Sequence, residues 1–309
     1  MPTRSTSARG FLLVVLAALC WGTSGISGDV VAERTGLDPL DIAWHRMSIG
    51  ATVLVAVHLT RRRPAPWGGQ RRRLAAVGAA LALYQCGYFA AVATAGVGLA
   101  TLVSLGLAPL LVALGAAVLG SGRPDRTTGT ALATALAGLV LLVGVSAGGD
   151  DGDAVLLGTL LSAAAALAYA GVLLLSAQVP DGVPTTTVGF AAGAVLLTPV
   201  AVLAGLDLTT DPLSLALLLY LGLVPTALAY GLFFAGVRAV PAAVASIGTL
   251  LEPLTATALA ALLLGERLAP TALAGGALML GAVTALYLRR MGDSNSRGLA
   301  PNPLSKRAP

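Results

Sequence analysis

Two side chains of opposite charge lie inside long apolar stretches of this 309-residue chain. Glu252 falls in the stretch 241–264, and Arg46 falls in the stretch 40–60. A charged group in an apolar environment is costly, so each of them needs a reason to be there. A carboxylate at this depth can bind a proton, a cation or a substrate amine, and a guanidinium can hold a substrate carboxylate through two parallel hydrogen bonds.

Each of these groups also has a structural interpretation. Glu252 can pair with Arg46, or it can cap the backbone carbonyls that Pro253 leaves without a donor. Arg46 can pair with Asp41 or extend to a polar surface. His45 can relay protons, or it can simply be hydrogen-bonded within the protein. The residue types leave both interpretations open.

Further polar and aromatic side chains recur in the apolar stretches. Tyr84 and Tyr88, four residues apart, share one helical face, and Thr249 extends a polar stripe beside Glu252. The side chains that can line one central pocket are Trp21, Ser24, Tyr84, Gln85, Tyr88, Ser104, Tyr169 and Tyr230. Alternatively, Trp and Tyr form belts at a membrane surface, while Ser, Thr and Gln bond neighbouring helices.

The sequence lacks the motifs of catalysis and cofactor binding. Its only lysine is Lys306, so the chain contains no phosphate-binding loop of the P-loop type. The two histidines, His45 and His58, are too far apart for an H-E-x-x-H metal site. The G-x-S-x-G match at 144–148 lies at the end of a predicted spanning helix and not after a strand, so it is not the nucleophile elbow of a serine hydrolase. We therefore expect neither an enzyme nor a bound metal or cofactor.

The composition predicts a helical membrane protein. Hydrophobic residues make up 56% of the chain and charged residues 11%, against roughly 25% charged in soluble domains. A spanning helix needs about 20 apolar residues. Stretches of that kind cover 11–30, 40–60, 74–93, 99–120, 127–147, 155–177, 184–204, 213–235, 241–264 and 270–288. We predict an all-α protein with ten transmembrane helices, in which the joint 95–98 is either a loop or a kink.

The arginines predict the orientation in the membrane. Sixteen of the nineteen basic residues fall on one side of the predicted spans, in the tail 1–10, the joint 61–73, the C-terminal segment and nearby joints. By the positive-inside rule both termini are cytoplasmic, in the inner cell membrane. Because orientation accounts for the basic residues, nucleic acid is not an expected partner. The segment 291–309 is predicted to be a disordered cytoplasmic tail.

A shift of 144 residues aligns the chain with itself, placing Leu107-Ala108-Pro109 on Leu251-Glu252-Pro253. This predicts two repeats, 11–147 and 148–290, with five helices each. Because five is odd, the second repeat enters the membrane from the opposite side, and inverted repeats are typical of transporters. Pro109 and Pro253 predict interrupted helices at equivalent places, and therefore a binding site between the fourth and ninth helices.

Several short motifs, in this order, resemble the EamA type of the drug/metabolite transporter superfamily. They are Cys20-Trp21-Gly22, Ala43-Trp44-His45-Arg46, and Leu251-Glu252-Pro253 running on to Leu263-Leu264-Gly265-Glu266-Arg267. Members usually carry a glycine-glutamate pair at the end of the fourth helix as well. This chain has Gly120-Ser121-Gly122 there, so a role for that acid in the first half is in doubt.

The resemblance covers about residues 11–288 and implies a secondary active transporter working by alternating access. It implies export of amino acids, related small metabolites or drug-like compounds, with proton coupling resting on Glu252. A membrane scaffold that transports nothing, or a lipid flippase, is the alternative. The expected partners are a small-molecule substrate, the lipid bilayer and, if Glu252 couples transport, protons. A monomer and a homodimer are both compatible with the sequence.

Overall fold

The computed structural model describes residues 5–60, 69–119, 125–143, 152–180, 182–263 and 270–298. Within these ranges every regular element is a helix. Seven described helical stretches are long and apolar enough to cross a membrane, and two shorter apolar helices cover 103–118 and 273–286. The all-helical membrane architecture is thus confirmed. The seven stretches found among the described residues are fewer than the ten predicted spans.

The predicted apolar stretches coincide with helices throughout the described residues. The elements are α1 (Ser5–Gly22), α2 (Ser24–Thr35), α3 (Pro39–Thr60), α4 (Arg71–Val118), α5 (Arg126–Val143), α6 (Gly152–Ala177), α7 (Thr185–Ala204), α8 (Pro212–Leu221), η1 (Gly222–Leu228), α9 (Ala229–Val237), α10 (Ala242–Thr249), α11 (Leu251–Leu263) and α12 (Pro270–Gly298).

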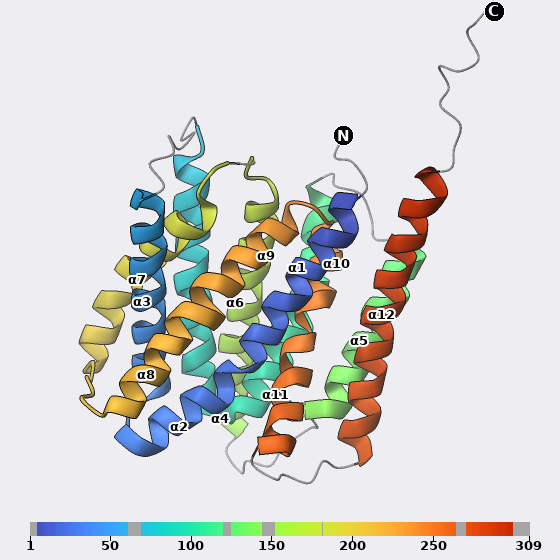
Figure 1. Cartoon of the computed structure of the whole chain (residues 1–309). Helices are drawn as coiled ribbons and strands as arrows, with labels where there is room; N and C mark the ends of the chain where they lie inside the picture. The colour runs from blue at the N-terminus through green and yellow to red at the C-terminus, as the bar shows by residue number, and fades with distance from the viewer. Residues whose placement is uncertain are drawn as a thin grey trace, which may run out of the picture.

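The helices form one bundle in which the start of α1 and the end of α12 lie at the same end, called here the terminus end (Figure 1). Helix α4 packs along α6 and α7, α3 packs on α7 and η1, and α1 packs on α9, α10 and α11. Helices α5 and α12 pack mainly on each other. Helix α2 and the first turn of α3 lie at the opposite end, called here the cavity end for the reason given below.

Helix α4 covers two of the predicted spans, 74–93 and 99–120, without a loop between them. The hydroxyls of Tyr88 and Thr101 are nevertheless 2.9 Å apart. Residues thirteen apart in a straight α-helix are separated by about 20 Å, which these two side chains cannot bridge. The helix therefore bends sharply between Tyr88 and Thr101, so the joint 95–98 lies in continuous helix within the bent stretch.

The first predicted span, 11–30, consists of two helices that break at Thr23. The Thr23 hydroxyl donates to the carbonyl of Cys20 at 2.7 Å, and the Ser24 hydroxyl donates to the carbonyl of Trp21 at 2.5 Å. Hydroxyls that bond back to the preceding turn bend helices. The chain therefore changes direction where α1 meets α2.

The span predicted at 213–235 contains a π-helical segment, η1, between α8 and α9. Pro225 inside it has no N–H to donate to the usual carbonyl. The Thr226 hydroxyl donates instead to the carbonyl of Leu221 at 2.8 Å, five residues earlier. Single π turns of this kind are frequent at functional sites.

The two prolines predicted to interrupt helices behave differently. Helix α4 runs through Pro109, so the predicted interruption there is wrong. Pro253 lies in the first turn of α11, where its missing N–H costs nothing because that donor has no partner within the helix. The break between α10 and α11 lies at Leu250, just before Glu252.

Large apolar side chains close the bundle toward the terminus end. We call this group the apolar seal; its members, from α1 and α9 and each at most 1% exposed, are Phe11, Val14, Phe233, Phe234 and Val237. They belong to one contiguous core with the cavity-facing rings described below. Close packing of this kind separates the cavity described below from the terminus end.

Helix α12 continues to Gly298, into the segment 291–309 for which a disordered tail is predicted. Residues 299–309, the start of the chain at 1–4, and the basic joint at 61–68 lie outside the described residues. The Arg289 guanidinium forms an ion pair with Asp125 at 2.9 Å, linking α12 to the residue that precedes α5.

Candidate functional site

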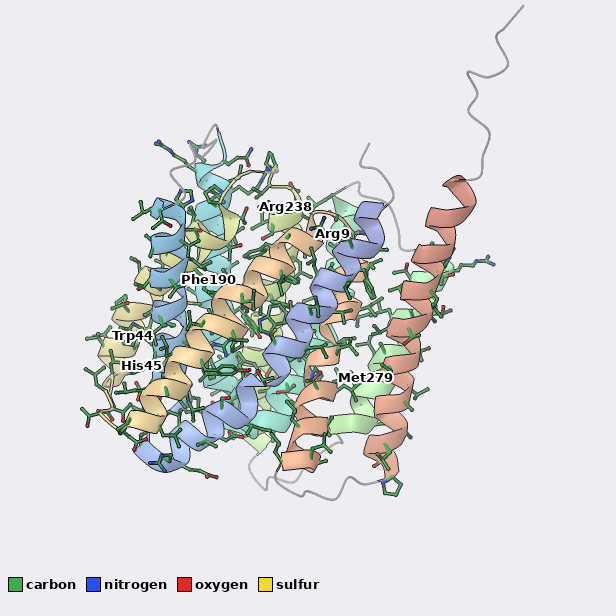
Figure 2. The ribbon with its side chains drawn as sticks, in the orientation of Figure 1. Arg9, Trp44, His45, Phe190, Arg238 and Met279 are labelled. Carbon is green, nitrogen blue, oxygen red and sulfur yellow. The ribbon has the colours of Figure 1, made fainter. Side chains whose placement is uncertain are left out.

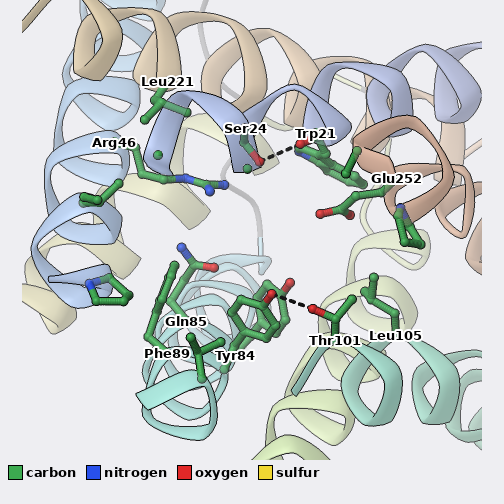
Figure 3. A pocket seen from close by; sticks show the side chains of 18 of the residues that line it. Trp21, Ser24, Arg46, Tyr84, Gln85, Phe89, Thr101, Leu105, Leu221 and Glu252 are labelled. Carbon is green, nitrogen blue, oxygen red and sulfur yellow. Dashed lines mark hydrogen bonds between the residues drawn. The ribbon is translucent and has the colours of Figure 1, made fainter. Parts of the chain in front are cut away.

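A cavity of about 270 Å³ penetrates the bundle from the cavity end (Figure 3). Its outer lining includes the exposed residues Asp29 and Pro39, whereas Tyr169 and Tyr230 at its inner limit are about 95% buried. The cavity therefore opens at the end away from the termini and stops at the apolar seal. Its walls come from α1, α2, α3, α4, α6, α8, α9 and α11.

The break between α1 and α2 shapes one wall. Trp21, the penultimate residue of α1, faces the cavity with its indole ring tilted against Tyr230 at a centroid distance of 4.7 Å. Its Nε1 is buried without a hydrogen-bond partner among the described residues. A buried donor left unpaired is costly, so this N–H is available to a ligand.

Glu252 enters the cavity from the first turn of α11, facing the region beside Trp21 (Figure 3). Its backbone is close to α1, because a Cβ added at Gly22 would clash with the Thr255 side chain and would be 2.9 Å from the Glu252 carbonyl oxygen. Only glycine allows this approach. Gly22 thus lets α1 and α11 meet at the depth of the carboxylate.

Arg46 projects into the cavity from α3, on the side opposite Glu252 (Figure 3). The two groups form no ion pair with each other, and the Arg46 Nε is buried without a partner in the described part of the chain. The structural interpretations that pair Arg46 with Glu252 or Asp41 are therefore wrong for this conformation. Asp41 accepts backbone N–H bonds from Asp38 and Asp207 instead.

Five aromatic rings form the inner part of the cavity. Tyr84 lies 5.0 Å from Tyr169 and 6.1 Å from Tyr88, measured between ring centroids. The Tyr230 ring continues this cluster against Trp21 and contacts Phe190 behind it at 4.6 Å. Aromatic faces provide apolar area while the tyrosine hydroxyls provide hydrogen bonds. This part of the cavity suits a flat or apolar portion of a ligand.

The structure brings most of the candidate residues into one cavity. Those that line it are Trp21, Ser24, Arg46, Tyr84, Gln85, Tyr88, Tyr169, Tyr230, Glu252 and Pro253. The other candidates lie outside its lining. Ser104 donates to the Ser162 carbonyl at 3.3 Å, and Thr249 donates to the Ser246 carbonyl at 2.8 Å.

His45 also lies away from the cavity, among α3, α7 and α8 (Figure 2). Its Nδ1 is hydrogen-bonded to the Asp41 carbonyl at 2.8 Å. Trp44 beside it donates from Nε1 to the Thr198 hydroxyl at 3.0 Å. These contacts match the structural interpretation of His45 given above and tie α3 to α7.

Several lining residues have no counterpart among the predicted ones, notably Asp29, Phe89, Thr101 and Leu221. Thr101 reaches the cavity only because α4 bends, and no spacing rule for a straight helix relates it to Tyr88. Asp29 lies on α2, three residues after Ile26. The sequence does not predict α2 as a helix separate from α1. The cavity lies between the predicted fourth and ninth spans at Thr101 and Glu252, but it is much broader than that interface.

Within the described residues, no three His, Cys, Asp or Glu side chains gather closely enough to hold a metal ion. The charged groups of the cavity are instead the Glu252 carboxylate and the Arg46 guanidinium, which face each other, and the Asp29 carboxylate in the outer lining. A site of that chemistry binds organic solutes that carry charge or hydrogen-bonding groups.

Apolar spanning helices, a cavity with buried charges and broken helices beside it define a membrane transport protein. The EamA-like transporter family matches this chain twice, over residues 8–144 and 156–288. An uncharacterized transporter of Bacillus subtilis (strain 168), YwfM, is 35% identical over 275 residues, which cover 87% of this chain and 90% of the relative. The protein belongs to the EamA-like transporter family, within the drug/metabolite transporter superfamily.

A solved crystal structure shares the fold. It superposes with a TM-score of 0.76 and covers 94% of this chain and 99% of its own, at 24% sequence identity. The likeness at this identity concerns the path of the chain alone. It extends over both halves of the protein, including the helices that surround the cavity.

Proposed function

We propose that this protein is a secondary active transporter that moves a small solute by alternating access. The observation that supports this most directly is the cavity itself, which holds opposite charges that form no ion pair with each other, opens at the cavity end and is closed by the apolar seal toward the other end. A solute crosses when the two halves rock so that the same cavity opens at the terminus end. The structure described here is one of the two states that such a cycle needs.

Ten helices in two inverted repeats, 11–147 and 148–290, would provide the two moving halves. Arg46 belongs to the first matched region and Glu252 to the second, so the charges come from different halves. With both termini cytoplasmic, as the arginines indicate, the cavity faces outward in this state. An outward-open cavity is where an exporter releases its solute from the cell.

The arrangement of charge favours a zwitterionic solute. Glu252 can accept hydrogen bonds from a substrate amine, while Arg46 can donate two to a carboxylate. Because the two groups form no ion pair with each other and the Arg46 Nε is buried without a hydrogen bond, a solute that carries both charges could bind both at once. Amino acids and related metabolites have this chemistry, and their side chains would lie on the rings of Tyr84 and Tyr169.

The first experiment measures solute and proton movement in liposomes that contain the purified protein and a pH-sensitive dye. Pools of amino acids, organic acids and cationic aromatic compounds are added in turn. We expect a saturable, substrate-dependent proton flux that the Glu252→Gln variant loses. Glu33→Gln is the matched control, because Glu33 is exposed and does not line the cavity. If labelled solute crosses in Glu252→Gln with the pH dependence of wild type, proton coupling through Glu252 is wrong.

A second experiment assigns the two charges. Amino acids are compared with analogues that lack the carboxylate or lack the amine. Arg46→Gln should lose discrimination against the analogue without a carboxylate, and Glu252→Gln should lose discrimination against the analogue without an amine. Groups built to bind a charge reject the analogue lacking it because they are left unpaired. Equal loss for every analogue in both variants would contradict the zwitterion assignment.

A further inference from the structure

Helix α2 forms one wall of the cavity at its mouth. Gly25, Gly28 and Ala32, on one face of this twelve-residue helix, all line the cavity. The helix ends at Gly36, whose backbone is left-handed with φ 73° and whose N–H bonds to the Ala32 carbonyl at 2.8 Å. Because α2 also begins at the break beside Thr23, it is a short element bounded by a bend at one end and a sharp stop at the other.

Helix α2 is attached to α8 at two points. Near its start, the Thr23 and Tyr220 hydroxyls are hydrogen-bonded at 2.8 Å. In its last turn, Arg34 donates from Nε to Oδ2 of Asp211 at 3.0 Å and from Nη2 to Oδ1 at 2.8 Å. We call this second contact the cavity-end pair. The two helices therefore lie antiparallel, with attachments at both ends of α2.

Asp211 is held in place for this contact by its own helix. It is the N-cap of α8 and accepts from the Ser214 backbone N–H at 2.9 Å and from the Ser214 hydroxyl at 2.7 Å. The hydrogen bonds from Arg34, followed by those from Ser214, hold the pKa of the Asp211 carboxyl well below its ordinary value. Ser214 thus holds the Asp211 carboxylate in place from α8, while Arg34 binds the same carboxylate from α2.

The cavity-end pair joins the two halves of the protein. Arg34 lies in the first matched region and Asp211 in the second. Its side chains are 46% and 26% exposed, so water can replace each contact when the pair separates. Exposed ion pairs stabilise a structure only slightly. A contact of that strength can bias one conformation without preventing the other.

We propose that the cavity-end pair positions α2 against α8 in the open-cavity conformation and separates when the cavity closes at this end. Arg34 and Asp211 are then positioning residues for the transport cycle, acting through the α2 wall and not through contact with the solute. This inference rests on the alternating access proposed above. Releasing α2 from α8 favours its movement over the cavity mouth, so loss of the pair reduces the open population.

The test measures how accessible the cavity is. A cysteine at Gly25 is the reporter, because a Cβ added there meets no atom within 4 Å, and Cys20 and Cys86 are replaced by alanine. The purified protein is labelled with a charged maleimide. We expect Arg34→Gln to slow labelling about two- to fivefold, the range that an exposed bidentate pair supports. Asp211→Asn should slow it equally, because asparagine keeps the cap and removes the charge.

Two further variants separate this role from general damage. The double variant Arg34→Gln with Asp211→Asn should label at the rate of either single variant, because all three remove one interaction. Arg289→Gln, which breaks the exposed pair at the terminus end, should not slow labelling. Unchanged or faster labelling in monodisperse Arg34→Gln protein overturns the proposal, as does an additive double variant.

The same preparations separate this proposal from the proposed function. Labelling needs no transport, whereas solute flux in liposomes does. If wild type moves no solute in any pool, the proposed function fails regardless of labelling. If wild type transports and Arg34→Gln shows wild-type labelling and wild-type flux, the proposed function stands and the positioning role is wrong.

Discussion

The two ends of the molecule carry the same kind of ion pair, and yet the cavity that holds Glu252 and Arg46 opens at one of them. At the cavity end, Asp211 caps α8 and binds Arg34; at the terminus end, Asp125 accepts from the Thr128 N–H at the start of α5 and binds Arg289. Each pair joins a helix of one half to a helix of the other. The cavity that holds Glu252 and Arg46 nevertheless reaches the surface at the first of these two ends, whereas a separate hollow lined by His58, Thr185 and Arg238 lies at the second.

The difference between the ends lies in the apolar side chains. Beyond Trp21 and Tyr230 toward the terminus end, the space is filled by the apolar seal. Toward the cavity end, the walls carry glycines and small residues of α2, such as Gly25, Gly28 and Ala32. On the proposal made above, packing closes the path of the solute and the ion pairs adjust how readily that path opens. The predictions below separate these two contributions.

The largest effect is expected from removing a ring of the seal. Phe233 is fully buried and contacts Trp21 at a centroid distance of 5.2 Å. Phe233→Ala should lower the free energy of unfolding by about 3–5 kcal/mol, because it leaves a cavity in a packed core. Chemical unfolding in detergent micelles measures this. Leu203→Ala, at a side chain that is 88% exposed, is the control, and an equal effect of both would contradict the seal.

A smaller effect is expected where α1 meets α11, at the depth of Glu252. Gly22→Ala forces a Cβ against Thr255, and overpacking of this kind costs about 1–3 kcal/mol. Gly25→Ala, three residues along, has open space and should be neutral or slightly stabilising. Both variants are compared by thermal unfolding. If Gly22→Ala were as stable as Gly25→Ala, close contact between α1 and α11 would not be required.

The next effect concerns the π-helical segment η1. Removing the Thr226 hydroxyl should lower the free energy of unfolding by about 1 kcal/mol. Thr226→Val abolishes the bond from the buried Thr226 hydroxyl to the Leu221 carbonyl. Thr52→Val is the matched control, since the exposed Thr52 makes a similar bond to the Ser48 carbonyl within regular α-helix. Equal losses in the two variants would show that the π turn adds no special dependence on its hydroxyl.

The smallest effect concerns pH at the cavity-end pair. A carboxyl whose pKa is lowered in the folded state stabilises that state fully at pH values above its ordinary pKa. It loses this stabilisation as the pH falls through the lowered pKa. Because the pKa of Asp211 is lowered, its contribution is complete between pH 5 and pH 8. The ratio of Gly25→Cys labelling rates in the wild-type background and in Asp211→Asn should stay constant across that range. If the ratio changes with a midpoint between pH 5 and pH 8, another titrating group controls the accessibility of the cavity.

Sequence patterns predicted the helices well because apolar runs of membrane length have few alternatives in a bilayer. They also brought Trp21, Arg46 and Glu252 together as candidates, since charged and polar groups inside such runs are rare. The sequence could not predict the bend in α4 or the position of Thr101 in the cavity lining, because a bend depends on packing against other helices. His45 and Ser104 were candidates for the cavity but do not line it. Each bonds a backbone carbonyl instead, which explains a polar residue in a span equally well.

The position of Glu252 distinguishes the two halves of the protein. The internal alignment places Ala108 opposite Glu252, so the corresponding position in the first half carries a methyl group. A symmetric pair of identical five-helix subunits would carry two carboxylates at this depth or none. One acid facing one arginine requires two matched regions that differ in sequence at this depth. The difference between the two regions therefore allows a binding chemistry that no homodimer of a single region possesses.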